Sequence, residues 1–174
     1  YFLALNYRMN EITGAVAVAQ LAKLREVAER RIASAGQLTT MLEGVPGITT
    51  PPVPDGDVHT FWKYCLNVDP DIIQGGSPAL GGALKEFDIA SAPRYIQKPS
   101  FMCQIFREQR TFGESRWPFT LARPEAVDYD PTKFPGTMRG LERILVLPWN
   151  EKYTTEHVRY IADAVHSSVT KLAR

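Results

Sequence analysis

Hydrophobic residues at helical spacing dominate the first quarter of the chain. From Ile12 to Leu42, apolar positions recur at helical intervals and charged residues fall largely between them. Gly14 and a run of alanines suit close packing, so we expect the first half of this pattern to be buried and the second half to be amphipathic. The segment Gly44–Gly47, which contains a proline, stops the pattern. We therefore predict one long helix that ends near Leu42.

Beyond this helix, extended stretches alternate with two further helical patterns. Stretches rich in β-branched and aromatic residues or bounded by prolines predict extended structure. These stretches are Ile48–Thr50, His59–Val68, 88–93 and Arg143–Pro148. Helices are predicted at Pro78–Phe87, with Ser77 as the N-cap residue, and from Thr154 onward. Residues 101–135, with scattered aromatics and prolines, are predicted to form an ordered loop laid on another surface. This order of elements predicts an α+β fold in which helices cover a small sheet.

The composition narrows the class of protein. The 174 residues suffice for one well-buried domain, and 44% of them are hydrophobic, which favours a globular chain. With 20 basic and 19 acidic residues and no basic stripe, nucleic acid is not an expected partner. Apolar runs such as Ile144–Leu147 are too short to span a bilayer and no signal peptide opens the chain, so we expect a cytoplasmic protein without membrane contact. Cys65 and Cys103 lie far apart without metal-ligand spacing and are expected to be reduced.

The stretch Asn6–Glu11 places an amide, a phenol and a guanidinium where the long helix begins. The first-turn N–H groups of a helix lack internal acceptors, and together with the helix dipole they attract an anion. Arg8 can add a forked cationic contact and Asn6 a further hydrogen bond, so a phosphate is the most natural ligand. The alternative is that Asn6 caps the helix and Arg8 is a solvated first-turn residue. The local pattern alone favours this second interpretation.

Three residues farther along are candidates for binding a substrate. His59 stands at the entrance of a predicted strand, where its ring can reach either a cleft or a backbone group. Tyr95 and Lys98 lie in an extended segment just before a proline. They either line a pocket for a polar ligand or serve as a packed phenol and a solvent-facing lysine.

The sequence gives little support for a metal site or for a Ser-His-Asp catalytic triad. His157 and His166 are nine positions apart on a predicted helix and so lie on nearly opposite faces, which is typical of solvated histidines. The chain has no GxSxG elbow to carry a nucleophilic serine. The acidic residues Glu125 and Asp128 are interpreted as surface charge. We therefore expect no metal site and no self-contained catalytic set.

Three parts of the chain match motifs of one enzyme family. Asn6–Ile12 resembles an N-Y-R-M-x-E helix start, and Ala15–Leu24 resembles the A-x-x-x-A-Q-L-x-K-L helix that follows it. His59–Tyr64 is similar to an H-x-aromatic-H-x-Tyr strand, and Leu147–Pro148 with the helix from Thr154 is similar to a closing L-P strand and helix. Together they resemble the C-terminal half of the DegT–StrS sugar aminotransferases, which are fold-type I enzymes that use pyridoxal phosphate. The resemblance covers nearly the whole chain.

This resemblance implies roles for the helix start and a division into domains. Asn6 and Arg8 would reach across a homodimer interface to the cofactor phosphate of the neighbouring subunit, which reverses the preference for a simple helix cap. Residues 1–45 would form the long helix at the domain junction and dimer interface, and residues 46–174 the small α+β domain. The large domain, with the lysine that forms a Schiff base with the cofactor, would precede Tyr1, where the chain opens without an initiator Met. This segment alone is therefore expected to be inactive.

The resemblance also implies a ping-pong transamination from glutamate or glutamine to a keto-sugar, usually nucleotide-linked, with His59, Tyr95 and Lys98 in the substrate site. Trp62 stands where the family motif has a second histidine, and residues 95–101 lack a histidine that the family often has. A keto-cyclitol therefore stays open as the substrate. Two other functions also stay open: a sugar dehydratase of the same fold whose Schiff-base lysine is replaced, and a non-catalytic dimerisation module.

Overall fold

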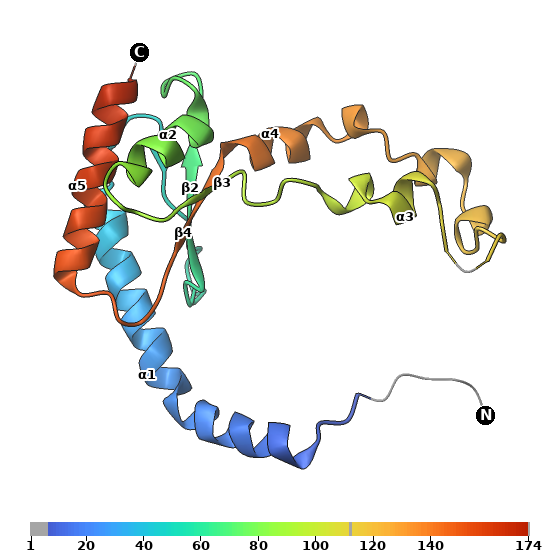
Figure 1. Ribbon diagram of the computed structural model, residues 1–174, viewed down its shortest axis with the longest axis horizontal. Coiled ribbons are helices and arrows are strands. Elements are labelled where there is room, and N and C mark those ends of the chain that lie inside the picture. The colour runs from blue at the N-terminus through green and yellow to red at the C-terminus, as the bar shows by residue number, and fades with distance from the viewer. Residues whose placement is uncertain (1–6, 112, 174) are drawn as a thin grey trace.

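A long helix, α1 (Glu11–Met41), leads from the beginning of the described chain to a small sheet (Figure 1). The computed structural model describes residues 7–111 and 113–173. The other strands and helices, in chain order, are β1 (Ile48–Thr49), β2 (Lys63–Val68), α2 (Gly76–Lys85), β3 (Ala92–Pro93), α3 (Gln104–Arg107), α4 (Pro135–Arg143), β4 (Ile144–Pro148) and α5 (Thr155–Leu172). Short 3-10 helices lie at η1 (Ser100–Met102), η2 (Phe119–Leu121), η3 (Pro124–Val127) and η4 (Pro131–Lys133).

The sheet has the strand order β1-β2-β4-β3, and each neighbouring pair of strands is antiparallel. The pair β2 and β4 forms its centre. The edge strand β3 pairs only with Leu145 and Val146 of β4. Within the described part of the chain, Leu147 and Pro148 therefore have no strand partner on the β3 side.

The core lies between one face of the sheet and three helices. Alternation along β2 buries Tyr64, Leu66 and Val68 on the same face. The C-terminal half of α1, together with α2 and α5, covers that face (Figure 1). The other buried core residues come from these helices, from the C-cap of α1 and from β4: Ala35, Leu38, Leu42, Leu80, Leu84, Leu145, Leu147, Val158, Ile161, Val165 and Val169. The predicted α+β fold, with helices over a small sheet, is confirmed.

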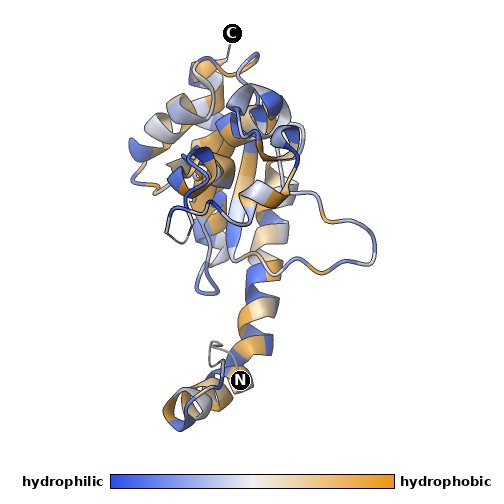
Figure 2. Ribbon diagram, turned by 90° about the vertical axis from the view of Figure 1, so that its right-hand side faces the viewer, coloured by the Kyte–Doolittle hydropathy of each residue, from blue (hydrophilic) through white to orange (hydrophobic). Residues whose placement is uncertain are grey.

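The N-terminal half of α1 stands apart from this core. Ile12 is 79% exposed and Val18 is 72% exposed. Figure 2 shows this half of the helix below the sheet, with apolar residues (orange) along it, and Figure 1 shows that α1 bends along its length. The prediction that the first half is buried is wrong for this chain, because the apolar pattern identifies a surface that favours burial but does not supply the residues that would cover it.

Helix α2 begins two residues earlier than the predicted start at Pro78. Gly75 is its N-cap residue in the left-handed conformation (φ 80°), and no side chain caps the first turn. The Ser77 hydroxyl is buried and donates to the carbonyl oxygen of Glu142, near the end of α4, at 2.7 Å. The predicted capping role of Ser77 is therefore wrong: its hydroxyl joins α2 to a segment 65 positions away in the sequence.

Replacing Ser77 with alanine is expected to lower the free energy of unfolding by about 1 kcal/mol, because a buried hydrogen bond between α2 and α4 is lost. Urea denaturation followed by circular dichroism measures the change. Ser167→Ala is the matched control, because Ser167 is exposed on α5 and should cost less than about 0.5 kcal/mol. Equal stability of the two variants would contradict a stabilising role for Ser77.

Residues 94–111 and 113–134, here called the arm, run out from the sheet and back beside themselves (Figure 1). The rings of Phe106, Phe119 and Tyr129 pack edge to face, with centroids 5.3 to 6.3 Å apart. The arm is therefore ordered by its own aromatic contacts. The predicted order is found, but Figure 1 shows the outer part of the arm projecting away from the sheet, so the expected supporting surface is not among the described residues.

Candidate functional site

The start of α1 is capped by Asn10 rather than by Asn6. The Asn10 side-chain oxygen accepts from the backbone N–H of Thr13 at 2.8 Å, and its carbonyl accepts from the N–H of Gly14 at 2.9 Å. Arg8 precedes the cap and is exposed, so it is not a first-turn residue as the alternative interpretation assumed. Asn6 lies outside the described residues, and its predicted role stays a prediction.

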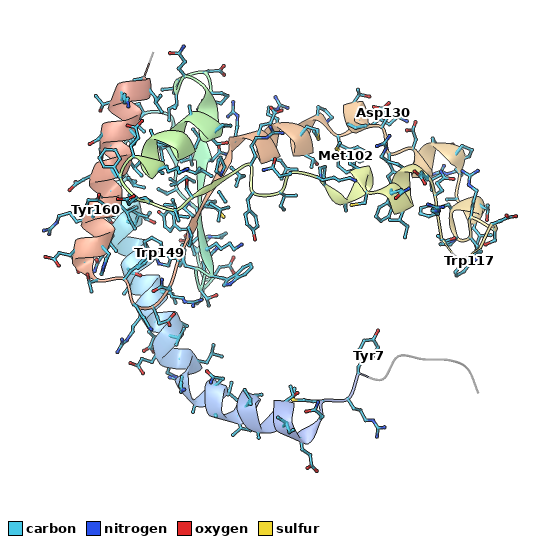
Figure 3. The ribbon with its side chains drawn as sticks, viewed as in Figure 1. Tyr7, Met102, Trp117, Asp130, Trp149 and Tyr160 are labelled. Carbon is cyan, nitrogen blue, oxygen red and sulfur yellow. The ribbon has the colours of Figure 1, made fainter. Side chains whose placement is uncertain are left out.

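The chemistry of this helix start fits a phosphate. The first N–H groups of α1 have no acceptor within the helix, and the helix dipole adds positive potential there. Residues 7–10 are all exposed, and Tyr7 is 88% exposed (Figure 3), so an anion can approach. Arg8, two residues before the N-cap Asn10, supplies a permanent cation near the start of the helix. Glu11, in the first turn, opposes an anion, and the guanidinium offsets that charge.

His59 is held by the backbone and also faces a hollow. Its Nδ1 atom accepts from the N–H of Phe61 at 2.9 Å, and the two rings lie 4.2 Å apart. A neutral imidazole whose Nδ1 is an acceptor carries its proton on Nε2, so Nε2 is a donor. The ring lines a hollow of about 500 Å³ between the C-terminal half of α1 and the loop before β2. Both predicted environments of His59, a backbone bond and a cavity, are therefore found together.

Tyr95 lies beside a lysine that sequence reasoning missed. The Lys63 ammonium donates to the Tyr95 hydroxyl. It lies 3.6 Å from the centroid of the Tyr95 ring and 4.3 Å from that of Trp62. Cation–π attraction holds such a group in place. The signal that could have found Lys63 is strand alternation, because a residue next to the buried Tyr64 must point to the opposite face of β2.

Lys98 is not part of this group. It is exposed in the arm, and among the described residues no hydrogen bond or ion pair involves it. The hollow beside His59 is lined by neither Tyr95 nor Lys98. The three predicted substrate residues therefore occupy three separate places in this chain: the hollow beside α1, the Trp62–Lys63–Tyr95 cluster and the arm.

Other reactive side chains have structural roles. Burial raises the pKa of the Cys65 thiol, which therefore stays protonated near neutral pH. His157 caps α5 together with Thr154, and His166 forms a 2.9 Å hydrogen bond with the carbonyl of Met41. Both histidines are exposed, as predicted, and each also has a defined hydrogen-bond partner. Across residues 7–111 and 113–173 there is no group of metal-ligating side chains and no helix long and apolar enough to cross a bilayer.

Solved structures define the class to which this fold belongs. The sugar aminotransferase Spr1654 of Streptococcus pneumoniae matches 95% of this chain with a TM-score of 0.70 and 18% identity, over 36% of its own length. PseC of Helicobacter pylori matches 98% with a TM-score of 0.69 and 17% identity, over 40% of its length. The chain therefore has the fold of part of each of these two proteins.

A sequence comparison makes the assignment specific. The model of the DegT/DnrJ/EryC1/StrS aminotransferase family matches residues 2–123, and the chain belongs to this family. The spore coat polysaccharide biosynthesis protein SpsC of Bacillus subtilis (strain 168) is 27% identical over 166 residues, which are 94% of this chain and 38% of SpsC. A dTDP-4-dehydro-2,3,6-trideoxy-D-glucose 4-aminotransferase of Saccharopolyspora spinosa is 27% identical over 161 residues, which are 92% of this chain and 34% of that enzyme. The chain thus spans little more than a third of these relatives.

Proposed function

We propose that the chain is the C-terminal part of a pyridoxal-phosphate-dependent aminotransferase that transfers an amino group from glutamate or glutamine to a keto group. The observation that carries the proposal is the family match over residues 2–123, which includes Arg8 and the three predicted substrate residues. The bound cofactor supplies the electron sink and carries the amino group. We assign the lysine that holds it to a segment preceding residue 1, so this chain alone is expected to be inactive.

In this proposal Arg8, together with Asn6, binds the cofactor phosphate of the partner subunit in a homodimer. A guanidinium next to the N–H donors of a helix start suits a phosphate dianion, since both contribute charge-assisted hydrogen bonds. The exposure of Arg8 supports a role in an intersubunit contact, because the described chain does not enclose it.

The exposed half of α1 is assigned to the junction with the large domain and to the dimer interface, within residues 1–45. Its apolar side chains exceed what an isolated surface helix needs. The exposed residues are Ile12, Val16, Val18, Leu21 and Leu24. Residues 46–174 then form the small domain, which closes one side of the active site.

The substrate is proposed to be a keto-sugar, nucleotide-linked or free, or a keto-cyclitol. The name of the Saccharopolyspora spinosa relative describes a nucleotide-linked keto-sugar substrate for that enzyme, which supports the first option. His59 Nε2 and the Tyr95 hydroxyl, which lie in separate places in this chain, are each suited to bind a hydroxyl of the substrate, and Lys98 is assigned to the same substrate from the arm. Lys63 orients the Tyr95 hydroxyl through their hydrogen bond.

Subunit mixing tests the shared site. An Arg8→Ala subunit is mixed with a subunit that lacks the Schiff-base lysine, in the full-length enzyme at limiting cofactor. If Arg8 acts across the interface, one site of each mixed dimer retains both groups. Random assortment then restores about a quarter of the parent activity, because half of the dimers are mixed and each has one complete site.

The control pairs Arg8→Ala with a subunit that carries both changes, a mixture in which no site retains both the lysine and Arg8. Because half of the subunits in the control lack the lysine, activity there should be about half that of Arg8→Ala alone at the same total subunit concentration. If the first mixture also stays at that level, Arg8 does not serve the neighbouring subunit. A measurable transamination of glutamate or glutamine with a keto-sugar by the parent enzyme checks the reaction itself.

A further inference from the structure

A hollow of about 540 Å³ opens between the N-terminal half of α5 and the loop that joins α2 to β3. It lies where β3 stops pairing and leaves Leu147 and Pro148 of β4 without a strand neighbour among the described residues. Its volume falls within the range of about 300–1,000 Å³ that is typical of small-molecule sites. Neither Arg8 nor any proposed substrate residue lines it.

The hollow has an apolar floor and aromatic walls. The floor consists of side chains from three elements: Ile89, Leu147 and Ile161. The walls are Tyr153 and Tyr160, and each hydroxyl donates to a backbone carbonyl. Tyr160, on α5 (Figure 3), bonds to Phe87 at 3.1 Å, and Tyr153 bonds to Pro148 at 3.3 Å. Because both hydroxyls are anchored, the rings keep a fixed position beside the hollow.

The charged groups of the hollow are acidic. Asp88 and Glu156 line it, and no lysine or arginine does. Within residues 7–111 and 113–173, neither carboxylate belongs to an ion pair. His157 also lines it, and its Nδ1 accepts from the N–H of Thr154 at 3.2 Å, as in a neutral imidazole. The two carboxylates therefore favour a cation, and the tyrosine rings that line the hollow can add cation–π attraction.

We propose that this hollow binds a small organic cation, namely a protonated or quaternary amine that carries an aryl or cycloalkyl body. The body packs on the apolar floor, and the ammonium lies between the two carboxylates and over the tyrosine rings. An anion of the same shape meets like charge at both acidic positions. The site is independent of the proposed aminotransferase activity, because binding needs neither the cofactor nor a partner subunit.

The test uses trimethyl(2-phenylethyl)ammonium as the probe and 3-phenylpropanoate as its anionic counterpart. A quaternary nitrogen cannot condense with the aldehyde of a cofactor, so a signal from the transaminase site is avoided. Ligand-detected NMR titration of the full-length protein measures both dissociation constants. The cation is expected to bind at least about tenfold more tightly than the anion, a difference of ~1.4 kcal/mol.

Substitutions of residues that line the hollow test whether the cation binds there. Asp88→Asn and Glu156→Gln should each weaken cation binding about threefold, as expected for an exposed ion pair. Ala90→Trp, at an exposed position that lines the hollow, should fill it and abolish binding without disturbing the core. Asp163→Asn is the matched control, because it removes an exposed carboxylate from α5 outside the hollow and should leave the affinity unchanged.

Equal affinity for the cation and the anion would overturn the proposal, because the hollow would then be merely apolar. Unchanged binding by Ala90→Trp would place the cation elsewhere and also overturn it. The subunit-mixing result does not bear on either outcome, so failure here and failure of the aminotransferase proposal are distinguishable.

Discussion

Replacing Arg8 with alanine is expected to weaken binding of pyridoxal phosphate to the full-length dimer by about ten- to a hundredfold. A hydrogen bond between a guanidinium and a phosphate contributes about 1.5–3 kcal/mol, which corresponds to this range of affinity. The start of α1 retains its N–H donors in the variant, so binding is weakened rather than abolished. Titration of the apo-enzyme, followed through the absorbance of the bound cofactor, measures the change.

Two further variants separate charge from structure. Arg8→Lys keeps the charge but not the fork, and should recover only part of the affinity. Arg159→Ala removes an exposed arginine from α5, outside the proposed dimer interface, and should bind the cofactor as the parent does. If Arg8→Ala binds the cofactor as tightly as the parent, the phosphate contact assigned to Arg8 is wrong, whatever the family of the chain.

Trp149→Ala is expected to lower the free energy of unfolding by about 3–5 kcal/mol, the range for truncating a buried tryptophan. Trp149 is 4% exposed and packs against Tyr64, with ring centroids 5.3 Å apart, and against Tyr153 at 4.9 Å. Its Nε1 donates to the Ser34 hydroxyl at 3.1 Å. The side chain thus joins the end of β4 to α1 and to the loop before α5. Urea denaturation of the 174-residue chain measures the loss.

Substitution of Trp149 with phenylalanine separates the contribution of ring packing from that of the Nε1 hydrogen bond. Trp149→Phe keeps an aromatic ring in the core but removes the donor, and should cost about 1–2 kcal/mol. Trp62→Ala is the control, because Trp62 is 69% exposed and its loss should cost less than about 1 kcal/mol. If Trp149→Ala and Trp62→Ala have the same free energy of unfolding, Trp149 does not stabilise the core as described.

The sequence correctly predicted the ends of elements that are set by residues next to them in the chain. The long helix ends at Met41, next to the predicted Leu42, and β4 ends at Pro148 as expected. Thr154 caps α5, and its hydroxyl accepts from the N–H of His157. Each of these signals acts within about one turn or one peptide bond, so the sequence carries it completely.

Other elements were missed because their stabilising contacts lie elsewhere. Helix α4 contains Gly136 and Gly140, which lower helix propensity, and it was not predicted. Ser77 satisfied the rule for an N-cap but bonds to Glu142 instead. In both cases tertiary packing decided the outcome, because the intrinsic preference of a residue is weak compared with its tertiary contacts.

In the candidate site, too, some features follow from local sequence and others depend on tertiary structure. The sequence by itself determined the family, the α+β class and a helix start rich in anion-binding groups, since these depend on the identity and spacing of adjacent residues. Only the tertiary structure placed Lys63 against Tyr95, 32 positions away, set His59 beside α1 and left half of that helix exposed. These placements depend on how segments far apart in the chain pack together, and no periodicity along the chain encodes them.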